Sequence, residues 1–225
     1  MTDVMLDPPH APQIAVPPAP VQTKNRWQRY GWLIGLLLIV GIGGTLLFTW
    51  LRPHPFHGLV LQSPDPATDF TLTASTGKPL SLSDFRGKMV LLYFGYTACP
   101  DACPLTLADL TQTLQSLGKK ADQVQVIFIT VDPAHDTPQR LAQYLTAFNK
   151  TFLGMTGSPD AISAAATQFG IYFDAPTAQN GQAAAQVAHT SSVVVIDRAG
   201  YVRLLFPNGT PPADMADDLA YLIGR

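Results

Sequence analysis

The chain contains only two cysteines, and they lie four positions apart in the stretch FGYTACPDACP, residues 94–104. They are Cys99 and Cys103, and a proline follows each of them. Thiolates are soft ligands that suit Cu(I), zinc and iron–sulfur clusters. Two thiols at this spacing can also form a structural disulfide, or alternate between dithiol and disulfide as a redox pair. The residue types therefore leave three kinds of chemistry open.

The number of residues between the cysteines bears on each of these roles. A disulfide across three intervening residues closes a very short loop and so removes little entropy from the unfolded chain. Thioredoxin-type redox pairs are usually separated by two residues rather than three, which weakens that interpretation without excluding it. Two thiols fill only half of a four-coordinate zinc site, so such a site would need further ligands.

The histidines are the first candidates for further metal ligands. His10 lies in the N-terminal tail, far from the cysteines along the chain. His54 and His57 follow a long apolar run and could form an adventitious metal site. His135 lies in the segment VDPAHDTP, and His189 directly precedes TSSVVVID. The fold decides which of these imidazoles can reach a thiol.

Continuous apolar runs at 88–96 and 123–131 are too short for helices and are typical of strands buried on both faces. A short hairpin is expected before them, and strands in TSSVVVID and YVRLLF after them. Helical patterns begin at Pro104, Thr137, Ser158 and Pro212. Strands that alternate with helices predict an α/β class with a partly parallel sheet, in the order of a thioredoxin-like fold.

This fold places the cysteines in the loop between the first buried strand and the following helix. The unpaired N–H groups of a helix N-terminus favour thiolates, so both Cys99 and Cys103 could be reactive. Asp132 and His135 follow the next parallel strand and are expected to lie near the same loop. His189 precedes a strand instead, and its spacing alone does not bring it there.

The uncharged apolar segment at 31–51 is long enough to cross a bilayer as a helix. Lys24, Arg26 and Arg29 precede it, whereas only Arg52 follows it closely, which predicts a cytoplasmic N-terminus. The run is longer than the core of a cleaved signal peptide, and no A-x-A-like site follows it. We expect a single-pass anchor in the inner (cytoplasmic) membrane, with the C-terminal domain facing the periplasm or extracytoplasmic side.

Composition divides the chain into four parts. Residues 1–30, rich in proline near the start, are expected to be a disordered cytoplasmic tail. They precede the transmembrane helix at 31–51, a proline-punctuated tether at 52–68 and a folded domain at 69–225. The 14 Lys+Arg nearly balance the 16 Asp+Glu, and no basic stripe is present, so no nucleic-acid partner is indicated.

The segments FGYTACPDACP, VDPAHDTP and AHTSSVVVID occur in the order seen in the Sco/SenC family, and the chain resembles that family over nearly everything after the apolar run. The resemblance implies a membrane-anchored, thioredoxin-like copper protein. It also implies that Cys99, Cys103 and His189 bind copper and that Asp132 is an acidic residue near the site. Two thiolates suffice for Cu(I), whereas an added imidazole suits Cu(II).

Members of the family assist assembly of the binuclear copper centre of cytochrome c oxidase. The implied partner is therefore the copper-containing oxidase subunit, with another periplasmic copper carrier or thiol reductase as a further partner. Two departures from the family pattern concern the site. His135 stands where an arginine is usual, so it is a second candidate near the copper, and Ala188 precedes His189 where many members have an aspartate.

Three hypotheses of different classes follow. The first is a copper metallochaperone without turnover, which needs Cys99, Cys103 and His189. The second is an extracytoplasmic thiol-disulfide oxidoreductase that reduces the cysteines of the oxidase subunit or another target and needs only the two thiols. The third is a peroxiredoxin-like peroxidase, whose activity would be independent of metal.

Overall fold

The computed structural model describes residues 26–51, 54–61, 65–173 and 191–224. It separates into two compact units, Met1–Pro53 and His54–Arg225. The first contains helix α1 (Arg26–Leu51), whose stretch Tyr30–Phe48 is long and apolar enough to cross a membrane, by length and composition. The helix begins five residues before the apolar run at 31–51, because Arg26 to Tyr30 continue the same helical backbone.

The second unit is built on one eight-stranded sheet with the order β1-β8-β7-β4-β5-β6-β2-β3. The central strands β4, β5 and β6 run parallel, and every other pairing is antiparallel. This arrangement confirms the predicted α/β class with a partly parallel sheet. The strands are β1 (Leu59–Val60), β2 (Thr71–Ala74), β3 (Pro79–Ser81), β4 (Met89–Gly95), β5 (Val124–Thr130), β6 (Leu153–Thr156), β7 (Val193–Ile196) and β8 (Val202–Phe206).

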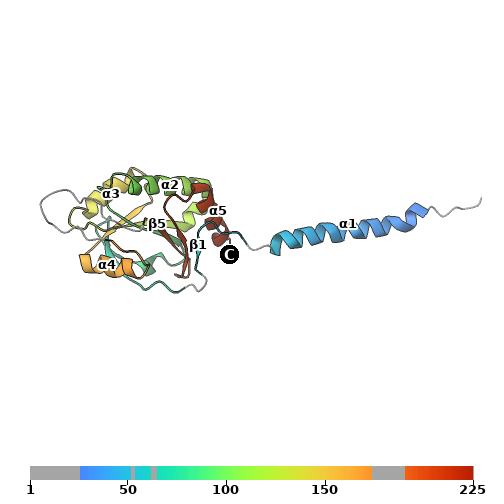
Figure 1. Ribbon diagram of the computed structural model, residues 1–225, viewed down its shortest axis with the longest axis horizontal. Coiled ribbons are helices and arrows are strands. Elements are labelled where there is room, and N and C mark those ends of the chain that lie inside the picture. Colours follow the sequence, from blue (N-terminus) through green and yellow to red (C-terminus); the bar gives the residue numbers. More distant parts are fainter. Residues whose placement is uncertain (1–25, 52–53, 62–64, 174–190, 225) are drawn as a thin grey trace, which may run out of the picture. The chain divides into compact units, whose positions relative to one another are not determined.

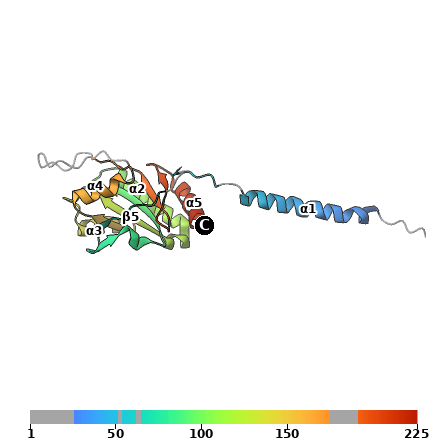
Figure 2. The same cartoon turned by 90° about the horizontal axis from the view of Figure 1, so that it is seen from below.

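Helices cover both faces of the sheet (Figures 1 and 2). Helices α2, α3 and α5 lie on one face and α4 on the other, as the two clusters of buried side chains also show. Short 3₁₀ turns lie at Leu82–Phe85 and Gly118–Gln123. The helices are α2 (Ala102–Leu117), α3 (Pro138–Thr146), α4 (Pro159–Thr167) and α5 (Pro212–Ile223).

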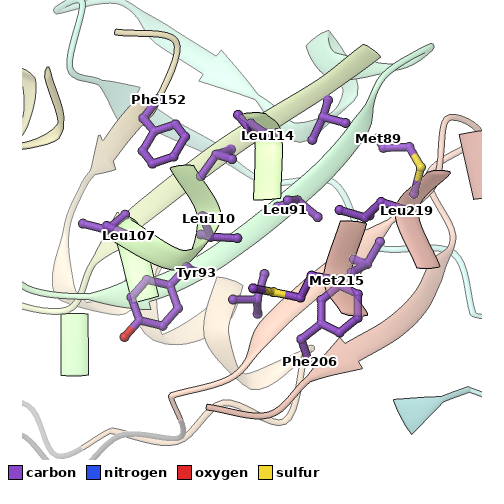
Figure 3. Packing of buried hydrophobic residues seen from close by; sticks show 14 of the residues in the cluster. Met89, Leu91, Tyr93, Leu107, Leu110, Leu114, Phe152, Phe206, Met215 and Leu219 are labelled. Atoms are coloured by element: carbon purple, nitrogen blue, oxygen red, sulfur yellow. The ribbon is translucent and has the colours of Figure 1, made fainter. Parts of the chain in front are cut away.

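All seven residues of β4 are buried, and their side chains alternate between the two faces. Leu91 and Tyr93 belong to the cluster beneath α2 and α5, whereas Leu92 and Phe94 belong to the cluster beneath α4. Figure 3 shows Tyr93 and Leu91 among the leucines of α2 and the side chains of α5. A strand covered on both faces needs an apolar residue at every position, which explains the uninterrupted run in the sequence.

Helix α2 begins at Ala102, two residues earlier than the predicted start at Pro104. The prediction relied on proline at the first helical position, but Pro104 is the third residue of the helix, where a backbone N–H still has no intrahelical acceptor. Cys103 therefore lies inside the first turn of α2 rather than before it.

Residues 54–60, which lie within the tether predicted at 52–68, pack on α5 and β8. Asp218 of α5 is fully buried, and its carboxylate accepts hydrogen bonds from the backbone N–H groups of His57 (3.0 Å) and Gly58 (2.9 Å). Its bond to the imidazole of His57 raises the pKa of that histidine, and burial only partly offsets the effect. The ring of His54 stacks on Tyr221. These partners are about 160 residues apart in the chain, so local pattern could not reveal them.

We predict that Asp218→Ala destabilises the folded unit by about 2–4 kcal/mol, because the buried N–H of Gly58 and the partly buried N–H of His57 lose their acceptor. Asp217→Ala is the matched control, since that neighbouring side chain is 61% exposed and should change stability by less than about 0.5 kcal/mol. Urea unfolding followed by circular dichroism measures both. Equal midpoints for wild type and Asp218→Ala would contradict the role of Asp218.

Candidate metal centre

The two cysteines meet at the junction of β4 and α2. The chain leaves β4 at Gly95 and turns so that the N–H of Cys99 donates to the carbonyl of Tyr96 (3.2 Å). The backbone N–H of Cys103, in the first turn of α2, then points at the Sγ atom of Cys99 at 3.4 Å. Both cysteines are free thiols. The sulfur of Cys99 thus partly satisfies a helix N–H that would otherwise lack an acceptor.

The two thiols have very different surroundings. Cys103 is fully buried, and this burial raises the pKa of its thiol to about 12. Cys99 is partly exposed; burial acts to raise its pKa, but hydrogen bonds from the backbone N–H groups of Asp101 and Cys103 outweigh it and lower the pKa. The accessible thiol is therefore the more acidic of the two and the one that forms a thiolate more readily.

The buried sulfur of Cys103 fits against β4 only because residue 95 is glycine. A Cβ atom at Gly95 would lie 2.8 Å from Sγ of Cys103 and 2.9 Å from the ring of Phe128. The hydroxyl of Tyr93, two residues earlier, donates to the same sulfur at 3.6 Å. Gly95 and Tyr93 thus fix the depth and the direction of the Cys103 thiol.

A buried carboxylate joins the cysteine loop to the loop after β5. Asp136 accepts hydrogen bonds from the backbone N–H of Thr97 (2.9 Å), from the Thr97 hydroxyl and from the hydroxyl of Thr130 (2.6 Å). Arg140 of α3 donates to the Thr97 hydroxyl at 2.7 Å and lies 3.6 Å from Asp136. Because Thr97 is two residues before Cys99, Asp136 holds the backbone that positions this thiol.

Asp132 and His135 form a pair at the same edge of the sheet. Asp132 is buried, and both of its carboxylate oxygens lie 2.9 Å from Nδ1 of His135. The histidine side chain itself is 62% exposed. Asp132 also lines a cavity of about 490 Å³ together with Phe173 and residues of α4. A largely exposed imidazole thus orients a buried aspartate.

The structure brings four of the five predicted site residues to one end of the parallel strands, namely Cys99, Cys103, Asp132 and His135. His189 lies outside the described residues. Sequence reasoning missed Tyr93, Gly95, Thr97, Asp136 and Arg140. Asp136 carried a usable signal, since it directly precedes the helix-capping Thr137 in the segment that contains Asp132 and His135.

Comparison with known proteins identifies the family. The SCO1/SenC family model matches residues 61–224. The chain belongs to the SCO1/SenC family. A SCO2-like protein of Rickettsia felis is 30% identical over 185 residues, which are 80% of this chain and 90% of the relative. The mitochondrial SCO2 protein of Saccharomyces cerevisiae is 36% identical over 196 residues, 81% of this chain and 63% of the relative.

Solved structures of the family share the fold. ScoI of Bradyrhizobium japonicum with copper bound is 34% identical with a TM-score of 0.63, and the match covers 70% of this chain and 99% of that one. Apo Sco1 of Thermus thermophilus is 38% identical with a TM-score of 0.68, covering 75% and 98% of the two chains. These likenesses confirm the thioredoxin-like fold that the order of elements predicted.

We predict that the two thiols ionise at widely separated pH values. In Cys103→Ser, the pH at which Cys99 reacts with iodoacetamide at half its maximal rate should be lower than is usual for a cysteine. In Cys99→Ser, the buried Cys103 should react slowly, and its rate should rise only at a pH several units above that needed for Cys99. The measurement is the alkylation rate against pH, with total thiols counted in denaturant as a control. Coincident profiles for the two variants would contradict the asymmetry.

Proposed function

We propose that this protein is a membrane-anchored copper metallochaperone that assists assembly of the binuclear copper centre of cytochrome c oxidase. The observation that carries the proposal is the pair of free thiols at the junction of β4 and α2, in a chain of the SCO1/SenC family. Copper is the cargo, and Cys99 and Cys103 are its two sulfur ligands. Copper-bound relatives such as the yeast Sco1 structure, 28% identical with a TM-score of 0.67, support copper as the metal.

The residues fit copper better than a metal that prefers oxygen ligands. The two sulfur donors are backed by apolar packing, and both clusters of buried side chains contact Cys99. Cu(I) accepts two thiolates alone, whereas Cu(II) prefers a further nitrogen donor, for which His189 is the proposed ligand. Asp132, held by His135, is proposed as the nearby acidic group. Because Cys99 is partly exposed, a thiol of the acceptor protein can replace it stepwise as a ligand.

Helix α1 is proposed to anchor the protein in the inner membrane as a single span. The excess of basic residues before it supports a cytoplasmic N-terminus, and the domain is proposed to face the periplasm or extracytoplasmic side. This location gives the thiols access to the copper-containing oxidase subunit, and to a periplasmic copper carrier or thiol reductase that would supply copper or electrons.

The asymmetry of the thiols also supports a second candidate, a thiol-disulfide reductase of the oxidase subunit. The Cys99 thiolate would attack a disulfide of the target, form a mixed disulfide and release one target thiol. Cys103 would then lose its proton and displace the second target thiol. Two electrons pass to the target, and a Cys99–Cys103 disulfide forms. This reaction needs no histidine.

A maturation assay separates the two candidates. In cells that lack their own family member, we predict that wild type restores the absorption of the oxidase's binuclear copper centre and that Cys99→Ser does not. His189→Ala should fall to the level of Cys99→Ser, because Cu(II) loses its nitrogen ligand. His10→Ala, which removes the histidine of the N-terminal tail, is the matched control and should keep the wild-type level. Full maturation by His189→Ala would argue against copper delivery and favour the reductase.

A further inference from the structure

A second group of side chains with the chemistry of metal ligands lies where residues 54–58 pack on α5. Nε2 of His54 lies 3.1 Å from Oδ1 of Asp218 and 3.8 Å from Oδ2 of Asp217. Nδ1 of His57 lies 3.1 Å from the same Oδ1 of Asp218, and its Nε2 lies 3.8 Å from Asp214. None of these residues takes part in the proposed copper site.

The cluster is rich in carboxylates, and its described basic partners are imidazoles rather than lysine or arginine side chains. Within the ranges that the structure describes, no lysine or arginine nitrogen forms an ion pair with Asp214, Asp217 or Asp218. Asp218 is fully buried, and its only described partners are two backbone N–H groups and the two imidazoles. A buried carboxylate beside two others is stabilised by an ion of double positive charge.

The nitrogen and oxygen atoms of this cluster lie close enough together to bind one metal ion. One atom from each of His54, Asp217 and Asp218 lies within 4.8 Å of the others. In a tetrahedral site with metal–nitrogen and metal–oxygen bonds of about 2.0–2.1 Å, neighbouring donors are about 3.3 Å apart. The two distances from Nε2 of His54, 3.1 and 3.8 Å, bracket that value.

We propose that His54, Asp217 and Asp218 form a site for a divalent transition-metal ion of the Zn²⁺ or Cu²⁺ class, separate from the thiol site. An imidazole and two carboxylates suit these ions, and they contain none of the sulfur that Cu(I) prefers. Binding displaces the proton that His54 shares with Asp218, and that proton passes to solvent. His57 keeps its hydrogen bond to Asp218 and orients the carboxylate.

The surroundings hold His54 in place for this role. Its ring stacks on Tyr221, with ring centroids 4.2 Å apart, and meets the edge of Phe56 at 4.8 Å. Its side chain is only 12% exposed, whereas Asp217 is 61% exposed and leaves the ion a path from solvent. The ligands come from both sides of one contact, because His54 is the third residue after α1 and the aspartates belong to α5. The ion would therefore fasten the chain next to α1 onto the domain.

The test uses the full chain in detergent micelles with Cys99 and Cys103 both changed to serine, so that thiols cannot bind the probe. Titration with Zn²⁺, followed by calorimetry, should show one ion per chain, and the midpoint of thermal unfolding should rise with Zn²⁺ concentration. His54→Ala should weaken binding by at least about tenfold, since even outer-shell partners of a ligand change affinity by 10- to 100-fold. His135→Ala, which removes an exposed imidazole elsewhere, is the matched control and should bind as the parent does.

Asp217→Ala keeps the inference testable if His54→Ala disturbs folding, because this exposed carboxylate is not needed for packing. It should also lose at least about tenfold in affinity while its unfolding midpoint without Zn²⁺ stays that of the parent. Unchanged Zn²⁺ affinity in Asp217→Ala, or an equal loss in His135→Ala, would overturn the proposal. Because the thiols are absent, either result leaves the proposed copper function unaffected.

Discussion

The site depends on the in-register parallel pairing of β4 with β5. Met89 opposes Val124 at one end and Gly95 opposes Thr130 at the other, so both strands end at the same edge of the sheet. The N–H of Val131 then donates to the carbonyl of Gly95 at 2.8 Å, one residue beyond the last pair. The loop with the cysteines and the loop with the acidic residues therefore start side by side, and Asp136 needs to bridge only a short distance to fix one against the other.

The same junction accounts for the unequal thiols. A helix must begin directly after the β4 loop to cover the sheet, and its first turn supplies N–H groups that lack partners. Cys99 lies outside the helix and receives one of them, whereas Cys103 is carried by α2 into the space that Gly95 leaves open. One thiol is therefore partly exposed and more acidic, while the other is buried and weakly acidic. A pair of this kind can take a soft metal ion from one protein and pass it to another, or transfer two electrons.

The sequence was sufficient for the class of fold, because the apolar runs of β4 and β5 and the capping residues Thr137 and Ser158 are local signals. It also located the cysteine loop and the neighbouring Asp132. It could not indicate that Asp136 bonds to the cysteine loop whereas Asp132 bonds to His135, since both buried aspartates lie in the same short loop. The contact of His54 and His57 with Asp218 joins residues about 160 positions apart, so it depends on tertiary structure alone.

The central claim is that Cys99 and Cys103 together are the copper ligands, and X-ray absorption at the copper K-edge tests it most directly. The full chain, reduced and loaded with one equivalent of Cu(I), should show two sulfur neighbours per copper. Replacing either cysteine by serine should lower that number while the other variants of the site leave it unchanged. A wild-type spectrum with only nitrogen and oxygen neighbours would contradict the account and place the bound copper away from the thiols.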